Sequence, residues 1–234
     1  MNWLERIFGK PPELTPEQAS RLARWKALPS PRRDAPLSAC RCVVVDVESS
    51  GLNITRDRLI AIGAIGIRQG VVALNDSLEI VLQQAQVSEK DNILIHGIGG
   101  TAQREGEPPA DALLTFLEYL GKDPLVAFHV GFDQPMISRA MKTHLGFNFQ
   151  HDWADLAYVA PALHPRLARS HRALDDWMAL FQISNYARHN ALADALSTAE
   201  LLLALRPKLD AREAASFQGL KALEGEWRRQ IHSG

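Results

Sequence analysis

Residues 42–48, Cys-Val-Val-Val-Asp-Val-Glu, are the feature that most constrains the fold of this chain. Short apolar runs rich in β-branched residues are typical of buried strands. Side chains two residues apart on a strand share a face, so Asp46 and Glu48 lie side by side near the strand's end. Neighbouring carboxylates repel each other, and a divalent cation bound through oxygen atoms relieves that repulsion. The pair indicates a metal site, with a solvated strand end as the alternative.

The segments that follow predict an α/β fold. The apolar runs 59–67 and 71–81 are joined by Arg68-Gln69-Gly70, a hairpin turn, and the Gly and Ala residues of 59–67 indicate close packing by another element. A short strand is expected at 125–128 and a loop at 88–107, with helices at 111–120, 135–144, 153–162, 171–182 and 190–205. An antiparallel start followed by alternating strands and helices is typical of an α/β fold with a mixed sheet.

The chain of 234 residues divides into three parts by charge and proline content. We expect an N-terminal helical extension at 1–40, a central domain at 41–205 and a C-terminal helical tail at 206–234. The net charge is +4 over residues 1–41, −7 in the middle and +2 over residues 206–234. An acidic centre suits a nucleic-acid-binding protein only where cations offset its charge, so the distribution also points to a metal site.

Several classes of protein are excluded by what the sequence lacks. No apolar run approaches the ~20 residues of a membrane span. The N-terminal stretch carries charges among its apolar residues and lacks a signal-peptide layout, so we expect a cytoplasmic protein with no membrane partner. There is no Walker loop, zinc motif or nucleophile elbow.

Two further segments carry acidic residues that are candidate metal ligands. Asp133 follows the short strand at 125–128 and precedes a helix, at the edge where α/β sheets place ligands; a helix N-cap is its alternative role. Asp194 lies in a helix among Ala and Leu residues, and His189 stands about where that helix begins; an exposed acid at a helix start is the alternative. Four carboxylates and one histidine predict a two-metal site, whose cations lie roughly 4 Å apart. Histidine suits proton transfer from water near neutral pH.

These motifs resemble those of the DEDD superfamily of 3′–5′ exonucleases, in the branch whose third motif carries histidine. Over about residues 41–205 the chain is similar to the proofreading epsilon subunits of bacterial DNA polymerase III, and also to ribonuclease T and oligoribonuclease. The matching motifs are Asp46-Val47-Glu48-Ser49-Ser50-Gly51-Leu52, then Ile95-His96-Gly97-Ile98, and last His189, Ala191 and Asp194.

The resemblance implies an RNase H-like fold, with a mixed sheet of about five strands flanked by helices. It also implies that Asp46, Glu48, Asp133 and Asp194 bind two Mg²⁺ or Mn²⁺ ions and that His189 is the general base. By the same resemblance Ser50, Gly51 and Leu52 hold the 3′ end of the substrate, with His96 and Phe132 against its sugar or base. The chain departs from the family in its second motif, where Phe128 and His129 replace the usual His and Asn. Asp155 is expected to have a structural role.

The function expected from this resemblance is hydrolysis of the 3′-terminal phosphodiester of single-stranded or frayed DNA, with release of nucleoside 5′-monophosphates. Three alternatives remain open: an exoribonuclease, a polymerase-associated proofreading subunit that acts mainly through partner binding, and a non-catalytic nucleic-acid binder. Partner binding through the terminal extensions would use the apolar stripes around Trp25 and Trp227, unless these pack on their own domain. The arginines of the N-terminal extension are candidates for holding the substrate strand: Arg21, Arg24, Arg32 and Arg33.

Overall fold

The computed structural model describes residues 12–232. The first eleven residues of the expected N-terminal extension and the last two of the expected tail lie outside this range. The elements are α2 (Pro16–Lys26), β1 (Arg41–Ser49), β2 (Leu59–Arg68), β3 (Val71–Val81), α3 (Lys90–His96), α4 (Gly100–Glu105), α5 (Pro109–Leu120), β4 (Leu125–Ala127), α6 (Val130–Leu145), β5 (Trp153–Asp155), α7 (Leu156–Leu163), the 3₁₀ turn η1 (Pro165–Leu167), α8 (Leu174–Phe181), α9 (Ala191–Ala211) and α10 (Phe217–His232).

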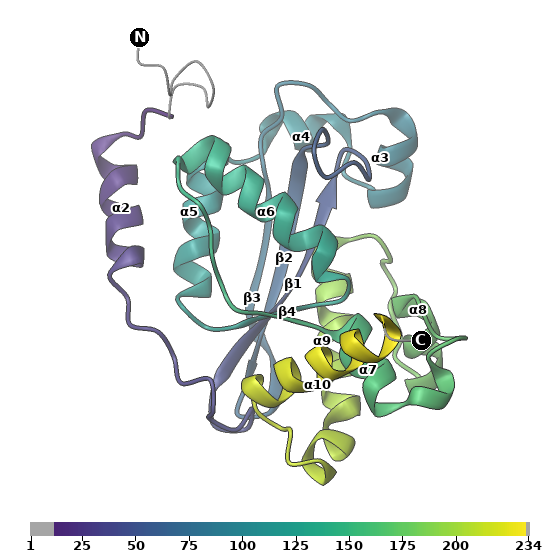
Figure 1. The fold of residues 1–234 in the computed structure, drawn as a ribbon. Helices are drawn as coiled ribbons and strands as arrows, with labels where there is room; N and C mark the ends of the chain where they lie inside the picture. Colours follow the sequence, from purple (N-terminus) through teal and green to yellow (C-terminus); the bar gives the residue numbers. More distant parts are fainter. Residues whose placement is uncertain (1–11, 233–234) are drawn as a thin grey trace.

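One five-stranded sheet in the order β3-β2-β1-β4-β5 forms the centre of the molecule, with helices on both faces (Figure 1). β1 pairs antiparallel with β2, and β2 with β3, whereas β4 pairs parallel with β1 and with β5. The α/β class and the mixed sheet of five strands are therefore confirmed. β1 lies at the centre of the sheet, so the apolar run that begins at Cys42 is buried on both faces.

The two faces of β1 belong to two separate cores. Val43, Val45 and Val47 pack under α2, α5 and α6, while Cys42 and Val44 pack under α7, α8, α9 and α10. Since side chains alternate along a strand, Asp46 and Glu48 continue the Cys42–Val44 face and point toward α9. The strand pattern thus decides which helix these two carboxylates meet.

α9 lies directly on β1 and β2 because Gly63 leaves room for it. A Cβ at Gly63 would overlap the backbone of Ala191 and Leu192, in the first turn of α9. Gly63 is the residue opposite Asp46 in the antiparallel ladder. The close packing expected from the glycines of this strand is confirmed, and it brings the start of α9 beside Asp46.

Three elements differ from the sequence-based expectation. Residues 88–107 were expected to be a loop, yet they hold the short helices α3 and α4. A helix was expected at 153–162, but its first three residues form β5, which hydrogen-bonds to β4 at the edge of the sheet. α6 begins at Val130, five residues before the expected start, so Asp133 lies in its first turn and is not its N-cap.

The N-terminal helix α2 packs along α5, on the side of the molecule away from α9 and α10 (Figure 1). Thr15 and Gln18 form a capping box at its N-terminus. Trp25 is buried, and its indole N–H donates to the carbonyl of Gly121 at 2.6 Å. Trp25 therefore packs on its own domain, which is the alternative to partner docking.

The arginines of this region are mostly paired with carboxylates. Arg21 contacts Glu118 and Asp111, Arg32 contacts Asp34 and Arg33 contacts Asp152. These three guanidinium groups are neutralised within the chain, so the structure does not favour the hypothesis that they hold the substrate strand. Among the described helices, none is both long and apolar enough to cross a membrane.

Candidate active site

Three carboxylates meet where β1 and α9 come together. Oxygen atoms of Asp46, Glu48 and Asp194 all lie within 4.8 Å of one another. Asp46 and Glu48 come from the same face of β1, and Asp194 comes from the first turn of α9. Asp194 is 5% exposed, which makes it one of the few buried charged residues of the chain. The sequence prediction that these three residues converge is met by the geometry.

Asp133 approaches the same place from the opposite layer. It lies in the first turn of α6 and is 3% exposed. β4 ends at Ala127, so α6 begins close to the end of β1 and carries Asp133 there. Asp133 is not one of the three carboxylates grouped within 4.8 Å, but it is near enough to Asp46 to raise the pKa of that residue.

These carboxylates carry more negative charge than the nearby positive groups offset. Burial raises the pKa of Asp46 well above its ordinary value, and the charges of Asp133 and Asp194 raise it further. Burial and the charge of Asp194 raise the pKa of Glu48 to about 8. The pKa of Asp133 is also raised, mainly by burial, although backbone N–H groups oppose the shift. Bound cations would remove this unfavourable charge.

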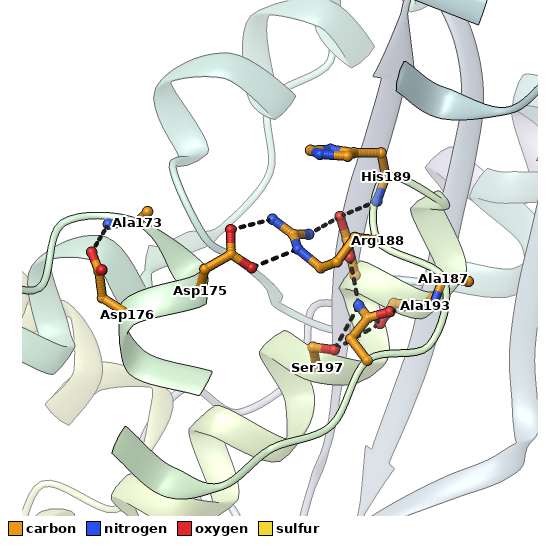
Figure 2. A network of polar contacts seen from close by, with 10 residues as sticks. Ala173, Asp175, Asp176, Ala187, Arg188, His189, Ala193 and Ser197 are labelled. Atoms are coloured by element: carbon orange, nitrogen blue, oxygen red, sulfur yellow. Dashed lines mark hydrogen bonds and ion pairs between the residues drawn. The ribbon is translucent and has the colours of Figure 1, made fainter. Parts of the chain in front are cut away.

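Arg188 supplies the one guanidinium that lines this cleft. Its guanidinium donates to Asp194 and also donates two hydrogen bonds to the Asp175 carboxylate, at 2.7 Å and 3.1 Å, as Figure 2 shows. These hydrogen bonds raise the pKa of Arg188 despite its burial, and its charge lowers the pKa of Asp46 and Glu48. Arg188 was not among the residues predicted from the sequence. The signal for it was an arginine directly before His189 and six residues before Asp194.

His189 lies at the mouth of the cleft, just before the N-cap residue of α9. Its backbone is left-handed, with φ of 63°, a conformation that histidine adopts more readily than most residues. This conformation directs its backbone N–H to the Asp194 carboxylate at 3.1 Å, while the ring extends away from that contact (Figure 2). The ring is exposed and has no hydrogen-bond partner within residues 12–232. It is thus free to meet a substrate or water.

Two asparagines hold this segment in place. Asn190 caps α9 by accepting from the N–H of Ala193, and its side-chain amide donates to Glu79 on β3. The Asn185 amide donates to the second oxygen of Asp194 at 2.6 Å. Asp194 therefore has three donors, which fix the orientation of its carboxylate.

The residues expected to hold the 3′ end lie in the turn after β1. The Ser50 hydroxyl accepts from the N–H of Arg58 at 2.9 Å, so it stabilises the turn. A Cβ at Gly51 would press against the Asp57 carboxylate, which explains the glycine. Leu52 is 89% exposed. The exposure of Leu52 fits the expected contact with a bound nucleotide.

His96 and Phe132 are less exposed to solvent than Leu52. His96 is buried at the end of α3, where Nδ1 accepts from the N–H of Ile98 and Nε2 lies 3.3 Å from the Ser88 hydroxyl. Phe132 is half-buried and packs against the core under α6. In this structure His96 supports the α3–α4 loop, and its contact with substrate stays a prediction.

Asp155 has the structural role that the sequence suggested. Its carboxylate accepts from the N–H groups of His129 and Val130 at the start of α6, and from that of Ala157 in α7. Glu224 of α10 in turn accepts from the N–H of Asp155 at 3.3 Å. Asp155 therefore fixes the first turn of α6, which carries Asp133.

The cleft at this site has a volume of about 260 Å³. Its walls include the three grouped carboxylates, Arg188 and His189, with Phe128, His129 and Leu174 opposite. Another cavity, of about 540 Å³, lies between α6 and the start of β2, and none of these acidic residues lines it. The smaller, more polar cleft is where the chemical groups lie.

Known proteins resemble this chain in sequence. The family model RNase T, described as an exonuclease, matches residues 43–202. A DNA polymerase III of PolC type from Lacticaseibacillus paracasei is 27% identical over 194 residues, which are 82% of this chain and 13% of that protein. A DNA polymerase III subunit epsilon-like protein from Rhodobacter capsulatus is 26% identical over 191 residues, which are 79% of this chain and 26% of that protein. The chain thus spans a small part of each of these relatives.

Solved structures share the fold. Escherichia coli exonuclease I in complex with a dT13 oligonucleotide has a TM-score of 0.61 and 17% identity, over 73% of this chain and 42% of that one. Cell-death related nuclease 4 has a TM-score of 0.64 and 12% identity, over 75% and 66%. Exonuclease X in complex with 5′ overhanging duplex DNA has a TM-score of 0.58 and 15% identity, over 78% and 99%. The RNase H-like fold is therefore confirmed.

The family model spans the central sheet and the elements that carry Asp46, Glu48, Asp133 and Asp194. It covers more than half of the chain, and the relatives are DNA polymerase III proteins by name. This protein belongs to the RNase T family of exonucleases.

Proposed function

We propose that the protein is a metal-dependent 3′–5′ exonuclease that removes nucleoside 5′-monophosphates from the 3′ ends of single-stranded or frayed DNA. The observation that carries the proposal is the convergence of Asp46, Glu48 and Asp194 within 4.8 Å in a polar cleft that also holds His189. DNA as substrate is supported by the polymerase III relatives and by two structural neighbours, one in complex with a dT13 oligonucleotide and one with 5′ overhanging duplex DNA.

The donor set fits divalent cations. Carboxylate oxygens are the ligands that Mg²⁺ and Mn²⁺ prefer. Burial, and after it the neighbouring carboxylates, raise the pKa values of Asp46 and Glu48, and Arg188 opposes these shifts only in part. We propose that Asp46, Glu48, Asp133 and Asp194 hold two Mg²⁺ or Mn²⁺ ions. Bound cations would polarise the scissile phosphate and make a bound water more acidic.

The residues around the cleft have separate roles in this proposal. His189 accepts the proton of the attacking water, because its ring is exposed at the mouth of the cleft and makes no competing hydrogen bond within residues 12–232. Asn185 and the N–H of His189 keep the Asp194 carboxylate oriented. The 3′-terminal nucleotide contacts the turn of Ser50, Gly51 and Leu52, with Phe132 and His96 on its other side.

The proposed organisation has a catalytic unit at 41–205 with helical additions at 1–40 and 206–234. The relatives are DNA polymerase III proteins, so association with a polymerase through these additions is a further part of the proposal. Trp25 is buried in its own domain, so such an interface would use other residues.

The test of the proposed function is degradation of an oligomer labelled at its 5′ end, with Mg²⁺ or Mn²⁺. The expected result is a ladder of labelled products that shortens from the 3′ end and is absent with EDTA. Immediate release of a labelled mononucleotide would show the opposite polarity. Matched DNA and RNA oligomers compared side by side measure the preference between the two substrates.

A further inference from the structure

A further cavity of about 570 Å³ lies beside the catalytic cleft, between α7, η1 and α10. None of the four site carboxylates lines it. The walls combine aromatic and basic side chains, among them His129, Tyr158, Arg169, His171, Arg172 and Trp227.

The basic side of this cavity comes from the loop between α7 and α8. Residues 164–172 contain three arginines and no acidic residue. The side chains of Arg169 and Arg172 are exposed, and neither forms a hydrogen bond or ion pair with another residue of 12–232. Asp176 fixes this loop by accepting from the backbone N–H groups of Arg172 and Ala173. Two cations without partners on an anchored loop are suited to phosphate groups.

The aromatic side is built by α7 and α10, which lie against each other (Figure 1). The guanidinium of Arg228 lies 3.6 Å from the centre of the Tyr158 ring, and its Nε donates to Glu224 at 2.9 Å. These contacts fix α10 on α7, and both Tyr158 and Trp227 line the cavity. Fixed aromatic side chains offer stacking surfaces to nucleobases, which every base can use.

The cavity continues into the catalytic cleft at two points. His129 lines both, at the start of the helix that carries Asp133. Arg172 lines the cavity, and the next residue, Ala173, lines the cleft. The cavity therefore adjoins the cleft, within reach of nucleotides next to the one bound there.

We propose that this cavity binds the nucleotides of a single strand that lie on the 5′ side of the scissile phosphate, and this proposal rests on the proposed function. Arg169 and Arg172 contact the phosphates, and Tyr158 and Trp227 receive a base. The C-terminal tail is then part of the substrate-binding surface. Single strands of DNA and RNA share this chemistry, and the experiment includes both.

The experiment measures binding and cleavage separately in the full chain. Anisotropy of a labelled single-stranded 12-mer, recorded in EDTA, gives affinity without catalysis. Hydrolysis of the nitrophenyl ester of thymidine 5′-monophosphate, with Mn²⁺, gives chemistry without upstream nucleotides. The variants are Arg169→Ala/Arg172→Ala and Trp227→Leu. The control Lys26→Ala/Arg212→Ala removes the same charge from exposed positions outside the cavity.

We expect each cavity variant to bind the 12-mer roughly 5-fold to 100-fold more weakly, which is the range measured for loss of one base stack. The variant that lacks the two arginines should also show a reduced salt dependence of binding. Hydrolysis of the ester should stay within 2-fold of wild type. Equal weakening in the control double variant, or no weakening in either cavity variant, would overturn the proposal. If wild type binds the 12-mer through the cavity but cleaves neither substrate, the proposed function fails while the binding site stands.

Discussion

Gly63 lies opposite Asp46 in the β1–β2 ladder, and the backbone of Ala191 occupies the space where a Gly63 side chain would be. The first turn of α9 can therefore lie on the sheet at the point where the Asp46 side chain leaves it on the α9 side. Asp194 follows in the same turn and joins Asp46 and Glu48. The assembly of the candidate metal site thus depends on a residue that has no functional group.

We predict that Gly63→Ala separates α9 from the sheet and lowers both stability and cation binding. The added methyl overlaps backbone atoms of Ala191 and Leu192, which cannot rotate away as a side chain would. Overpacking of this kind costs about 1–3 kcal/mol, so the melting temperature should fall by several degrees. Thermal unfolding and Mn²⁺ titration by calorimetry measure the two effects.

The matched control is Gly131→Ala in the first turn of α6. A Cβ at that position meets no atom within 4 Å, and alanine is favoured over glycine in a helix. This variant should unfold at the same temperature as wild type or slightly higher. A Gly63→Ala protein with unchanged stability and Mn²⁺ affinity would show that the close approach of α9 is not required.

Glu48→Gln should make the metal-free protein less sensitive to high pH. The folded state raises the pKa of Glu48 from 4.5 to about 8, so between these values the folded chain binds more protons than the unfolded chain. Stability is then lost as the pH rises through this window, because the unfolded state releases the proton first. Melting temperatures in EDTA from pH 5 to 9 should fall less steeply for Glu48→Gln than for wild type.

The exposed carboxylate of Glu200, on α9, provides a comparison for this experiment. Glu200→Gln should reproduce the wild-type slope, because its side chain faces solvent. Identical slopes for wild type and Glu48→Gln would mean that Glu48 is not held in a crowded, negatively charged position.

Arg188→Met should tighten the binding of divalent cations. Arg188 donates to Asp194, so a cation bound by Asp194 has to compete with the guanidinium. A hydrogen bond to a charged group is worth about 1.5–3 kcal/mol, so we expect roughly tenfold tighter Mn²⁺ binding by calorimetry. Arg188→Lys retains the charge and should stay closer to wild type. Weaker binding in Arg188→Met would mean that Arg188 orients Asp194 for the metal.

Asp155→Asn should loosen the first turn of α6. The Asp155 carboxylate is 1% exposed and accepts from the N–H groups of His129, Val130 and Ala157. The amide has one acceptor oxygen fewer, which leaves a buried donor unsatisfied at a cost of about 1–3 kcal/mol. Thermal unfolding and hydrogen exchange of Val130 report the change.

Asp152→Asn serves as its control, because Asp152 pairs with Arg33 just before the start of β5, whereas Asp155 is the last residue of that strand. It should change the melting temperature by less than Asp155→Asn does. If Asp155→Asn unfolds at the wild-type temperature with full exchange protection at Val130, the carboxylate does not hold α6.

Much of the fold followed from local patterns. The β-branched run of β1 and the hairpin at Arg68-Gln69-Gly70 each depend on neighbouring residues, so the sequence predicted them. β5 was missed because Trp153–Asp155 is only three residues long, and its strand form depends on pairing with β4. The short helices α3 and α4 were missed because several glycines, at the end of α3 and at both ends of α4, resemble a loop.

The site was predictable where motif spacing determined it, and not where distant segments meet. Asp46 and Glu48 follow from strand alternation, and the resemblance to the exonucleases supplied Asp133, His189 and Asp194. Nothing in the local sequence showed that Arg188 would join Asp175 to Asp194, or that Glu224 of α10 would hold Asp155. Such contacts form between segments that the fold alone brings together.

The most direct test of a metal-dependent exonuclease at this cleft is the rate of mononucleotide release from a single-stranded DNA oligomer labelled in its 3′-terminal nucleotide. The rate is measured against Mg²⁺ and Mn²⁺ concentration for wild type, Asp194→Asn, His189→Ala and the Glu200→Gln control. We predict a cation-dependent rate that Glu200→Gln retains, that His189→Ala lowers about 10²–10⁴-fold with cation binding intact, and that Asp194→Asn abolishes together with cation binding. Release that persists in EDTA, or in Asp194→Asn at the wild-type rate, would contradict the assignment of this cleft as the catalytic metal site.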